Sequence, residues 1–462
     1  MPRYEFSEGS SNKFWEIELQ GNGFTTTWGK IGTDGQSKTQ TFKDASEAKK
    51  EYEKIIQSKV KKGYALADGE GGDDDAGDDG EPAEASELKS NPELEAAIAR
   101  NPGDEKAWLV YGDWLQSNGD VRGELMALQA KGNTKAANKL IAQHRETLFG
   151  ELAEKIFDEE GGEADEAELK ELEWHLGFLV GARLCTSYDA GSDLGEMTAT
   201  LLKLPVARFM RKLVWGLPSF DGDASGQGLI DAVIASPHPE TLESLFITDF
   251  EYPDENEMSW SAVGDLSALW AKTPNLKTLH LRGGNGCTLG KIEAPKLTHF
   301  THETGGMGSE ELDAIAAARW PNLESLEIWF GSDGYGGTCT VDNLRPIFAG
   351  EGLSKLKILR LKNGEFANDL IEPLAKSKIL KQLETVDLSM GTLFGPGIEA
   401  LVKYADAFRH LKSLDLEDNF LTEEDKERLK HAKLDNVTGL ESQREADDWG
   451  DDEEHRYASV GE

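Results

Sequence analysis

The chain has 462 residues, with 49 lysines and arginines against 86 aspartates and glutamates, which gives a formal net charge of −37. A protein this acidic repels phosphate groups, membrane surfaces and acidic proteins, so any contact with nucleic acid requires a local basic patch. The length exceeds what one ordinary hydrophobic core supports, and roughly two to four folding units are expected.

The three cysteines, Cys185, Cys287 and Cys339, lie far apart in the sequence and form no CxxC pair. This spacing predicts neither a disulfide framework nor a zinc site, and it is typical of a reducing cytoplasm. The N-terminus lacks the apolar core of a signal peptide, and no run approaches the roughly 18 apolar residues of a membrane span. We therefore expect a cytoplasmic protein.

Residues 1–66 differ from the rest of the chain, because eleven bases and nine acids give them a net charge of +2. The stretch KFWEIEL alternates apolar and polar residues, as a half-buried strand does. FTTTWGKIG and SKTQTF follow turns and are typical of two further strands. The next stretch begins with a cap at Asp44 or Ser46 and has apolar residues near helical spacing. A small antiparallel sheet packed on one helix is predicted.

The same stretch resembles a WGR domain, a family named for Trp-Gly-Arg in its second strand; here the residues are Trp28, Gly29 and Lys30. Members occur in poly(ADP-ribose) polymerases, where they grip DNA ends, and in many bacterial proteins. The resemblance implies a nucleic-acid contact at Trp28, Gly29 and Lys30, which Lys38 extends. Lysine lacks the bidentate fork of arginine, so the contact with phosphate is a point charge. The alternative is structural: Trp28 fills the interface between sheet and helix, and the glycines only make turns.

Two acidic segments are predicted to be disordered. Residues 67–90 hold ten acids against Lys89, and residues 441–462 hold nine acids against Arg444 and Arg456. Segments with high net charge and few apolar residues cannot offset the entropy lost on ordering. We interpret the first as a flexible linker and the second as a disordered tail.

Residues 91–173 are predicted to be a helical adaptor, since apolar residues recur at helical spacing between the breaks NPGD and SNGD. They resemble the bacterial repeat-companion domain, a family that precedes repeat arrays, through Asp113, Trp114, Leu115, Gly119, Asp120, Arg122, Gly123 and Glu124. Three of these are carboxylates and suggest a metal cluster. Arg122 in their midst favours a buried ion pair that fixes the helix–turn–helix instead.

Residues 174–440 repeat the pattern LxxLxL, in copies such as LKTLHL at 276, LESLEI at 323, LKILRL at 356 and LKSLDL at 411. Helical stretches separate the copies. The pattern is identified as a leucine-rich repeat array, in which parallel strands line a concave face. The predicted fold class is therefore multidomain α/β: an antiparallel sheet with one helix, a helical adaptor and an α/β solenoid.

Residues between the leucines of each strand point outward and form a mixed stripe. We predict that this stripe binds a protein partner, because aromatic and arginine side chains presented together are typical of interaction hot spots. The alternative is a solvated face on which Trp329 packs against the loop GSDGYGG. The predicted partner-binding residues are Phe246, His280, Arg282, Glu327, Trp329, Arg360 and Lys362.

No motif nominates a nucleophile, a general base, a cofactor or a metal. His299 and His302, with His280 and Cys287 nearby in the sequence, invite a zinc interpretation, but His299 and His302 face opposite sides of a strand. The sequence thus predicts an interaction protein rather than an enzyme, with the repeat face on one partner and the WGR-like module as a second docking site. The alternative is a regulator whose WGR-like module binds a DNA or RNA end.

Overall fold

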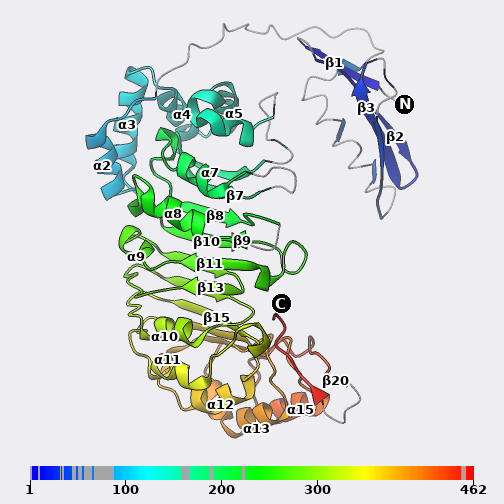
Figure 1. The fold of residues 1–462 in the computed structure, drawn as a ribbon, viewed down its shortest axis with the longest axis vertical. Helices are drawn as coiled ribbons and strands as arrows, with labels where there is room; N and C mark the ends of the chain where they lie inside the picture. Colours follow the sequence, from blue (N-terminus) through cyan, green and yellow to red (C-terminus); the bar gives the residue numbers. More distant parts are fainter. Residues whose placement is uncertain are drawn as a thin grey trace. The chain divides into compact units, whose positions relative to one another are not determined.

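The structure is a computed structural model that divides into two compact units, residues 1–83 and residues 84–462 (Figure 1). It describes residues 3–8, 11–31, 33, 36–43, 48–49, 52, 55–56, 65–66, 88–158, 164, 167–186, 192–220, 224–448 and 454–461. Residues 67–87 of the predicted linker lie outside this part of the chain.

The first unit is an antiparallel sheet in the order β4-β3-β2-β1-β5. Its strands are β1 (Arg3–Glu8), β2 (Ser11–Gln20), β3 (Gly23–Lys30), β4 (Gln36–Thr41) and β5 (Ala65–Leu66). Trp15, Ile17 and Phe24 form its core, with helical residues Tyr52 and Ile55 packed against them. The predicted sheet on one helix is confirmed, and the structure adds β1 and β5, which extend the sheet beyond β2.

The second unit is built on an 11-stranded sheet in the order β19-β18-β17-β16-β15-β14-β12-β10-β8-β7-β6. Strands from β7 onward run parallel, and only β6 pairs with its neighbour antiparallel. The predicted leucine-rich repeat array is confirmed. Its strands are β6 (Leu169–His175), β7 (Phe178–Leu184), β8 (Lys212–Gly216), β10 (Ser244–Asp249), β12 (Thr278–Arg282), β14 (His299–Glu303), β15 (Ser325–Gly331), β16 (Ile358–Gly364), β17 (Thr385–Asp387), β18 (Ser413–Asp415) and β19 (Val437–Thr438).

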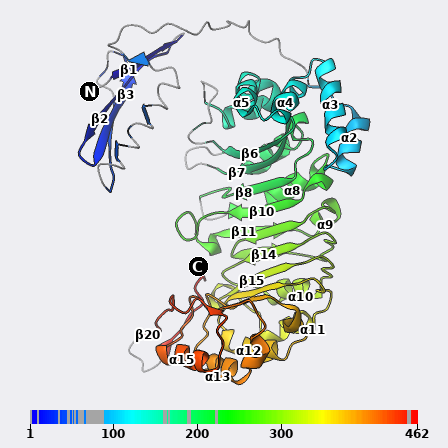
Figure 2. The same cartoon turned by 180° about the vertical axis from the view of Figure 1, so that it is seen from behind.

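Helices follow the strands and lie along one side of the stacked sheet (Figures 1 and 2). The repeat helices of this unit are α7 (Leu194–Leu201), α8 (Gln227–Ala235), α9 (Leu269–Lys272), α10 (Ser309–Ala317), α11 (Arg345–Ala349), α12 (Ala367–Ala375), α13 (Gly395–Lys403), α14 (Ala405–Phe408) and α15 (Glu423–His431). A side sheet, unpredicted, joins β9 (Ala224–Ser225), β11 (Ser261–Asp265) and β13 (Asn285–Thr288). One continuous apolar core runs from Val121 to Leu434, as expected where each repeat buries its leucines against the next.

The adaptor consists of α2 (Pro92–Arg100), α3 (Glu105–Ser117), α4 (Val121–Ala130), α5 (Thr134–Gln143) and α6 (Arg145–Phe149). It packs on the start of the array, because Ile98, Trp108 and Tyr111 share a core with Phe178 and Phe209. The repeat sheet therefore begins inside the predicted adaptor, at the start of β6, since the hairpin β6–β7 pairs with β8.

The predicted buried ion pair of the adaptor is confirmed. Arg122 Nη2 lies 2.7 Å from Asp120 Oδ2, and both side chains are fully buried. Asp113 and Glu124 are exposed. Asp120, by contrast, also accepts from the Arg122 backbone N–H at the start of α4, so the pair holds the helix–turn–helix.

The prediction of a disordered tail at residues 441–462 is wrong for residues 441–448 and 454–461. Val460 is 3 % exposed, and Asn363 bonds its backbone. The composition of the segment is acidic overall, but Tyr457 to Gly461 form a short stretch without acids. Within it, Val460 packs in an apolar pocket of the repeats. The last residues of the predicted linker are likewise held, since the Lys89 backbone N–H donates to Asp120 Oδ2 over 2.6 Å.

Candidate functional site

The predicted stripe forms a continuous row across the repeat sheet. The strand register places one residue from each of eight neighbouring strands, β8 to β18, opposite the next: Val214, Phe246, His280, Thr301, Glu327, Arg360, Asp387 and Asp415. A second row two residues further on pairs Arg282 with Glu303 and Trp329 with Lys362. All seven predicted partner-binding residues therefore lie on one face of the sheet.

Three of them meet at the N-terminal half of the array, where we name the group the arginine cluster: Arg183, Phe246, Asp249, His280, Arg282 and Glu303. The rings of Phe246 and His280 stack, with centroids 3.7 Å apart and 7° between their planes. Arg282 Nε lies 2.5 Å from Glu303 Oε2, and His280 Nε2 lies 3.0 Å from Glu303 Oε1. One carboxylate therefore serves two cationic or protonatable side chains.

Glu303 is the electrostatic centre of this cluster, and its side chain is only 8 % exposed. Burial by itself raises the pKa of Glu303, but His280 and Arg282 outweigh that effect and lower the pKa below its ordinary value. The carboxylate is therefore ionised at neutral pH. A second pair lies beside it, because Arg183 Nε is 3.0 Å from Asp249 Oδ2.

The other four predicted residues meet on β15 and β16, where we name the group the tryptophan cluster: Glu327, Trp329, Arg360, Lys362 and Asp387. Trp329 Nε1 donates to Glu327 Oε1 over 2.9 Å, and the Lys362 ammonium lies 5.2 Å from the Trp329 ring centroid. Arg360 and Lys362 each lie between Glu327 and Asp387, at 3.6 to 3.9 Å.

In both clusters the charges of the predicted stripe are paired with one another. Each predicted cation already has a carboxylate neighbour, and Phe246 and Trp329 are half-buried rather than exposed. The acids that neutralise the cations, Asp249, Glu303 and Asp387, were not among the predicted residues. A ladder of opposite charges at facing strand positions is the signal that could have found them.

The C-terminal segment, residues 454–461, lies against the same face. The Asn363 side chain donates to Val460 O over 2.6 Å and accepts from Val460 N–H over 2.8 Å. Ser459 N–H donates to Met390 O over 2.9 Å. Asn363 has a φ of 57°, a conformation that asparagine tolerates better than most residues. The Asn363 side chain therefore forms hydrogen bonds with both backbone groups of Val460.

The Val460 side chain packs in an apolar cluster with Leu217, Phe250 and Met258, against which Trp329 and Met390 also pack. Arg444 and Arg456, which precede Val460 in the sequence, make further contacts with the repeats. Arg444 Nη2 donates to Gly391 O over 2.7 Å, and Arg456 lies 4.1 Å from the centroid of the Phe394 ring.

A cleft of ≈ 760 Å³ lies where this segment meets the array. The charged residues Arg183, Asp249, Arg282 and Glu303 line it together with Trp329, Tyr252, Met390, Ser459 and Val460. The cleft therefore joins apolar surface to paired charges, a combination that suits a peptide.

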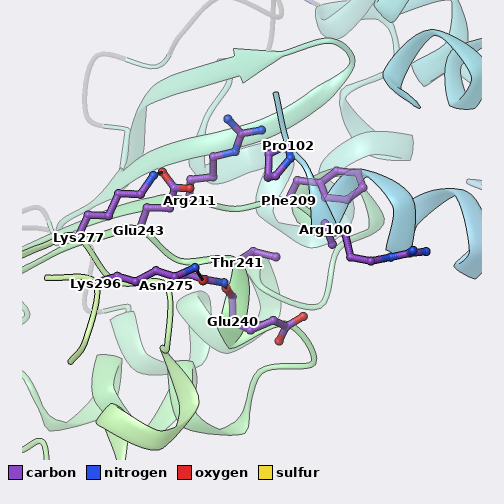
Figure 3. A pocket seen from close by; sticks show the side chains of 11 residues that line it. Arg100, Pro102, Phe209, Arg211, Glu240, Thr241, Glu243, Asn275, Lys277 and Lys296 are labelled. Carbon is purple, nitrogen blue, oxygen red and sulfur yellow. Dashed lines mark hydrogen bonds and ion pairs between the residues drawn. The ribbon is translucent and has the colours of Figure 1, made fainter. Parts of the chain in front are cut away.

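A smaller hollow of ≈ 260 Å³ lies between α2 and the starting edge of the repeat strands (Figure 3). Its lining includes Arg100, Lys277 and Lys296. Lys277 Nζ lies 2.8 Å from Glu243 Oε2, and Lys296 Nζ donates to Asn275 Oδ1 over 2.6 Å. Because these two lysines already have partners, we interpret the hollow as a packing gap between α2 and the repeats rather than as an anion-binding site.

The first unit presents the predicted nucleic-acid residues on β3 and β4. Trp28 pairs with Trp15 and is 39 % exposed, although its strand face is the one that carries the core. Lys38 pairs with Thr26, so the register puts it on the same face as Trp28, and its side chain is exposed. Gly29 and Lys30 complete the β3 strand, but their side-chain positions lie outside the described part. Trp28 therefore combines contact with the sheet and access to solvent.

In the part of the chain that the structure describes, no helix has the length and apolar character needed to span a bilayer.

Comparison with known proteins finds the WGR domain family model at residues 3–70. Two Escherichia coli proteins are similar there: YehF, 45 % identical over 64 residues, and YfeS, 37 % identical over 62 residues. These matches cover 14 % and 13 % of this chain, and only 23 % and 25 % of the relatives. A crystal structure of a Bacteroides fragilis protein aligns with 96 % of this chain and 97 % of its own, at a TM-score of 0.50 and 23 % identity.

The Bacteroides likeness concerns the fold alone, and the family model concerns the first unit alone. The antiparallel sheet, the matching model and the two relatives agree for that unit, while the parallel sheet with its buried leucines defines the second. Residues 3–70 belong to the WGR domain family, and they precede a leucine-rich repeat array.

Proposed function

We propose that this protein is a non-enzymatic adaptor whose repeat array binds an extended peptide segment of a protein partner in the concave cleft. The observation that carries the proposal is the C-terminal segment held there. Asn363 bonds both backbone groups of Val460, and an apolar pocket takes the Val460 side chain. Backbone capture combined with a side-chain pocket is how grooves recognise extended peptides.

The partner segment that this cleft suits has the character of its present occupant. Residues 458–461 are Ala, Ser, Val and Gly, small residues with one branched side chain at the pocket. An attached segment has a local concentration on the order of millimolar, so a partner segment must displace it. We therefore expect weak binding to the intact protein and stronger binding once the segment is dislodged.

The test uses a fluorescent peptide of residues 454–462 and the full-length chain carrying Val460→Asp, which puts a charge into the apolar pocket. We expect this variant to bind the peptide, as measured by anisotropy, and the unmodified chain to bind it at least about tenfold more weakly because its own segment competes. A second change, Asn363→Gly, removes two hydrogen bonds of about 1 kcal/mol each. It should lower the affinity for the peptide about tenfold or more.

The matched control is Lys433→Gly, since Lys433 has the same left-handed backbone, at φ 57°, and an exposed side chain away from the cleft. It should leave binding unchanged. Equal binding by the unmodified and Val460→Asp chains, or none by either, contradicts the proposal.

In this proposal the WGR domain is a second docking site, and the alternative is that it binds a nucleic-acid end. The half-exposed ring of Trp28 and the exposed side chain of Lys38 favour the alternative, because an aromatic face can stack on a base while a cation meets phosphate. A labelled oligonucleotide tested with the full-length chain at two salt concentrations separates the two. Salt-dependent binding that Trp28→Ala and Lys38→Ala weaken, and that Lys49→Ala spares, supports the nucleic-acid role.

We further propose a cytoplasmic location. All three cysteines are free, as expected of a protein kept in a reducing compartment.

A further inference from the structure

His302 occupies a core position of the repeat array that is leucine or isoleucine in the neighbouring strands. The register places His302 opposite Leu281 on one side and Ile328 on the other, so it occupies the position that leucine or isoleucine holds in the neighbouring repeats. Its side chain is 0 % exposed, whereas His299 on the same strand faces solvent. The two histidines therefore diverge, as the sequence predicted, but His302 points into the core.

Neither ring nitrogen of His302 has a hydrogen-bond partner among the described residues. A buried polar group without a partner costs free energy, and such groups are rare in native proteins. The imidazole nitrogen that carries no proton is therefore open to a metal ion, and the other can donate its N–H.

Two further ligand types converge on this histidine. Cys287 comes from β13 of the side sheet, and Glu311 comes from the first turn of α10. The Cys287 thiol, a His302 nitrogen and a Glu311 carboxylate oxygen all lie within 4.8 Å of one another. Since His302 bonds neither of them, the three donors are spaced for a shared ion rather than for hydrogen bonds with one another.

We propose that Cys287, His302 and Glu311 bind a divalent zinc ion that ties β13, β14 and α10 together. Sulfur, nitrogen and oxygen ligands of this mixture suit zinc, whereas calcium and magnesium take oxygen ligands alone. A water molecule is the natural fourth ligand, because three protein ligands leave one tetrahedral position open. The proposal departs from the sequence prediction of no metal site, which weighed His299, His302, His280 and Cys287 but not Glu311.

Cys339 lies close by and provides an internal control. Its thiol donates to Met307 O over 3.2 Å and contacts Gly308 O at 3.4 Å, so it has its own partners. It stands outside the group of three whose donor atoms converge. A metal bound through Cys287 should therefore be indifferent to Cys339.

The test uses full-length protein stripped with a chelator, then titrated with Co²⁺, whose thiolate charge-transfer and ligand-field absorption reports sulfur ligation and tetrahedral geometry. We expect one equivalent of Co²⁺ that one equivalent of Zn²⁺ displaces. His302→Leu and Cys287→Ser should each lower the affinity by about 100-fold or more, since even outer-shell changes cost up to that factor. Cys287→Ser should also remove the charge-transfer band, and Glu311→Gln should weaken binding.

The matched controls are His299→Leu and Cys339→Ser, which should leave the spectrum and affinity unchanged. His302→Leu restores the residue type of the neighbouring repeats, so its metal-free form should melt at or above the wild-type temperature. An unchanged melting temperature of His302→Leu would show that this variant has lost the metal site and not its fold. Absence of cobalt binding by the wild type, or undiminished binding by Cys287→Ser, overturns the proposal.

Discussion

The repeat array makes two contacts with other parts of its own unit, and they are built differently. At its start, the adaptor buries Trp108, Tyr111 and Ile98 against Phe178 and Phe209. On its concave face, the C-terminal segment is held mainly by hydrogen bonds to Asn363 and by one apolar side chain, Val460. The first contact is a core and the second is a ligand-like docking, so only the second can exchange with a partner at modest cost.

A buried carboxylate reinforces the adaptor contact. Glu95 lies 3.1 Å from Arg208 Nε and accepts from the Tyr111 hydroxyl over 2.7 Å and from the Ser90 hydroxyl over 2.8 Å. Arg208 lies on the repeat side of this contact, just after Ala207 of the buried array core. The contact is therefore both apolar and ionic, whereas the C-terminal segment is held by backbone hydrogen bonds and by the apolar side chain of Val460.

The largest expected effect comes from the adaptor core. Trp108 is 1 % exposed and its ring lies 4.9 Å from that of Phe209, so Trp108→Ala should cost about 3–5 kcal/mol of unfolding free energy. Chemical denaturation of the full chain measures the loss. Trp260→Ala is the control, because Trp260 is 49 % exposed and its loss should change stability by less than about 0.5 kcal/mol. Equal effects of the two changes would mean that the adaptor does not share a core with the repeats.

The next effect concerns the ionic part of the same contact. Glu95→Ala leaves Arg208 without its carboxylate in a site where both side chains are largely buried, and should cost about 3 kcal/mol, the low end for buried pairs. Denaturation again provides the measurement. Glu93→Ala, an exposed change in the same helical turn, should be nearly neutral.

A smaller effect is expected at the C-terminal segment. Asn363→Gly keeps the left-handed backbone but removes two hydrogen bonds, and should cost about 1–2 kcal/mol. Limited proteolysis should then cleave the C-terminal segment faster, while the adaptor stays protected. If cleavage rates match those of the unmodified chain, the segment is held by something other than Asn363.

The smallest effect is a pH dependence of the adaptor contact. Burial alone raises the pKa of Glu95, but hydrogen bonds from Tyr111, Ser90 and Arg208 lower it below its ordinary value. The pKa is therefore lower in the folded state than in the unfolded state, about 4.3. The stabilisation is full above that unfolded pKa and is lost as pH falls through the folded pKa. Denaturation of the wild type and Glu95→Gln should show a difference in stability that shrinks below pH about 4.

Much of the repeat fold was predictable from sequence. The LxxLxL copies at 276, 323, 356 and 411 correspond to β12, β15, β16 and β18. Because side chains alternate along a strand, the outward row from Phe246 to Asp415 was also predicted residue by residue. On β10 the alternation ends at Thr248, which is buried, because a register shift between Ile247 and Asp249 pairs Asp249 with Gly216.

The candidate sites were less predictable. The seven residues predicted to bind a partner share one face of the sheet, and the carboxylates that neutralise their cations, Asp249, Glu303 and Asp387, come from neighbouring strands. Trp28 shows a second limit of the sequence prediction. Its position on the strand predicts which face of the sheet it lies on, but not that its side chain is 39 % exposed. Exposure depends on what packs over the ring, which alternation does not encode.

The sequence by itself determined the periodic features of this protein: the WGR strands, the repeat strands and the outward stripe, all of which follow from the local alternation of apolar side chains. Only the tertiary structure decided where Val460 docks and that Cys287, His302 and Glu311 meet. Asn363 and Val460 are 97 residues apart, and the three ligand residues come from a side-sheet strand, a repeat strand and a helix. Such meetings arise because stacking the repeats brings distant positions together, and no local pattern records them.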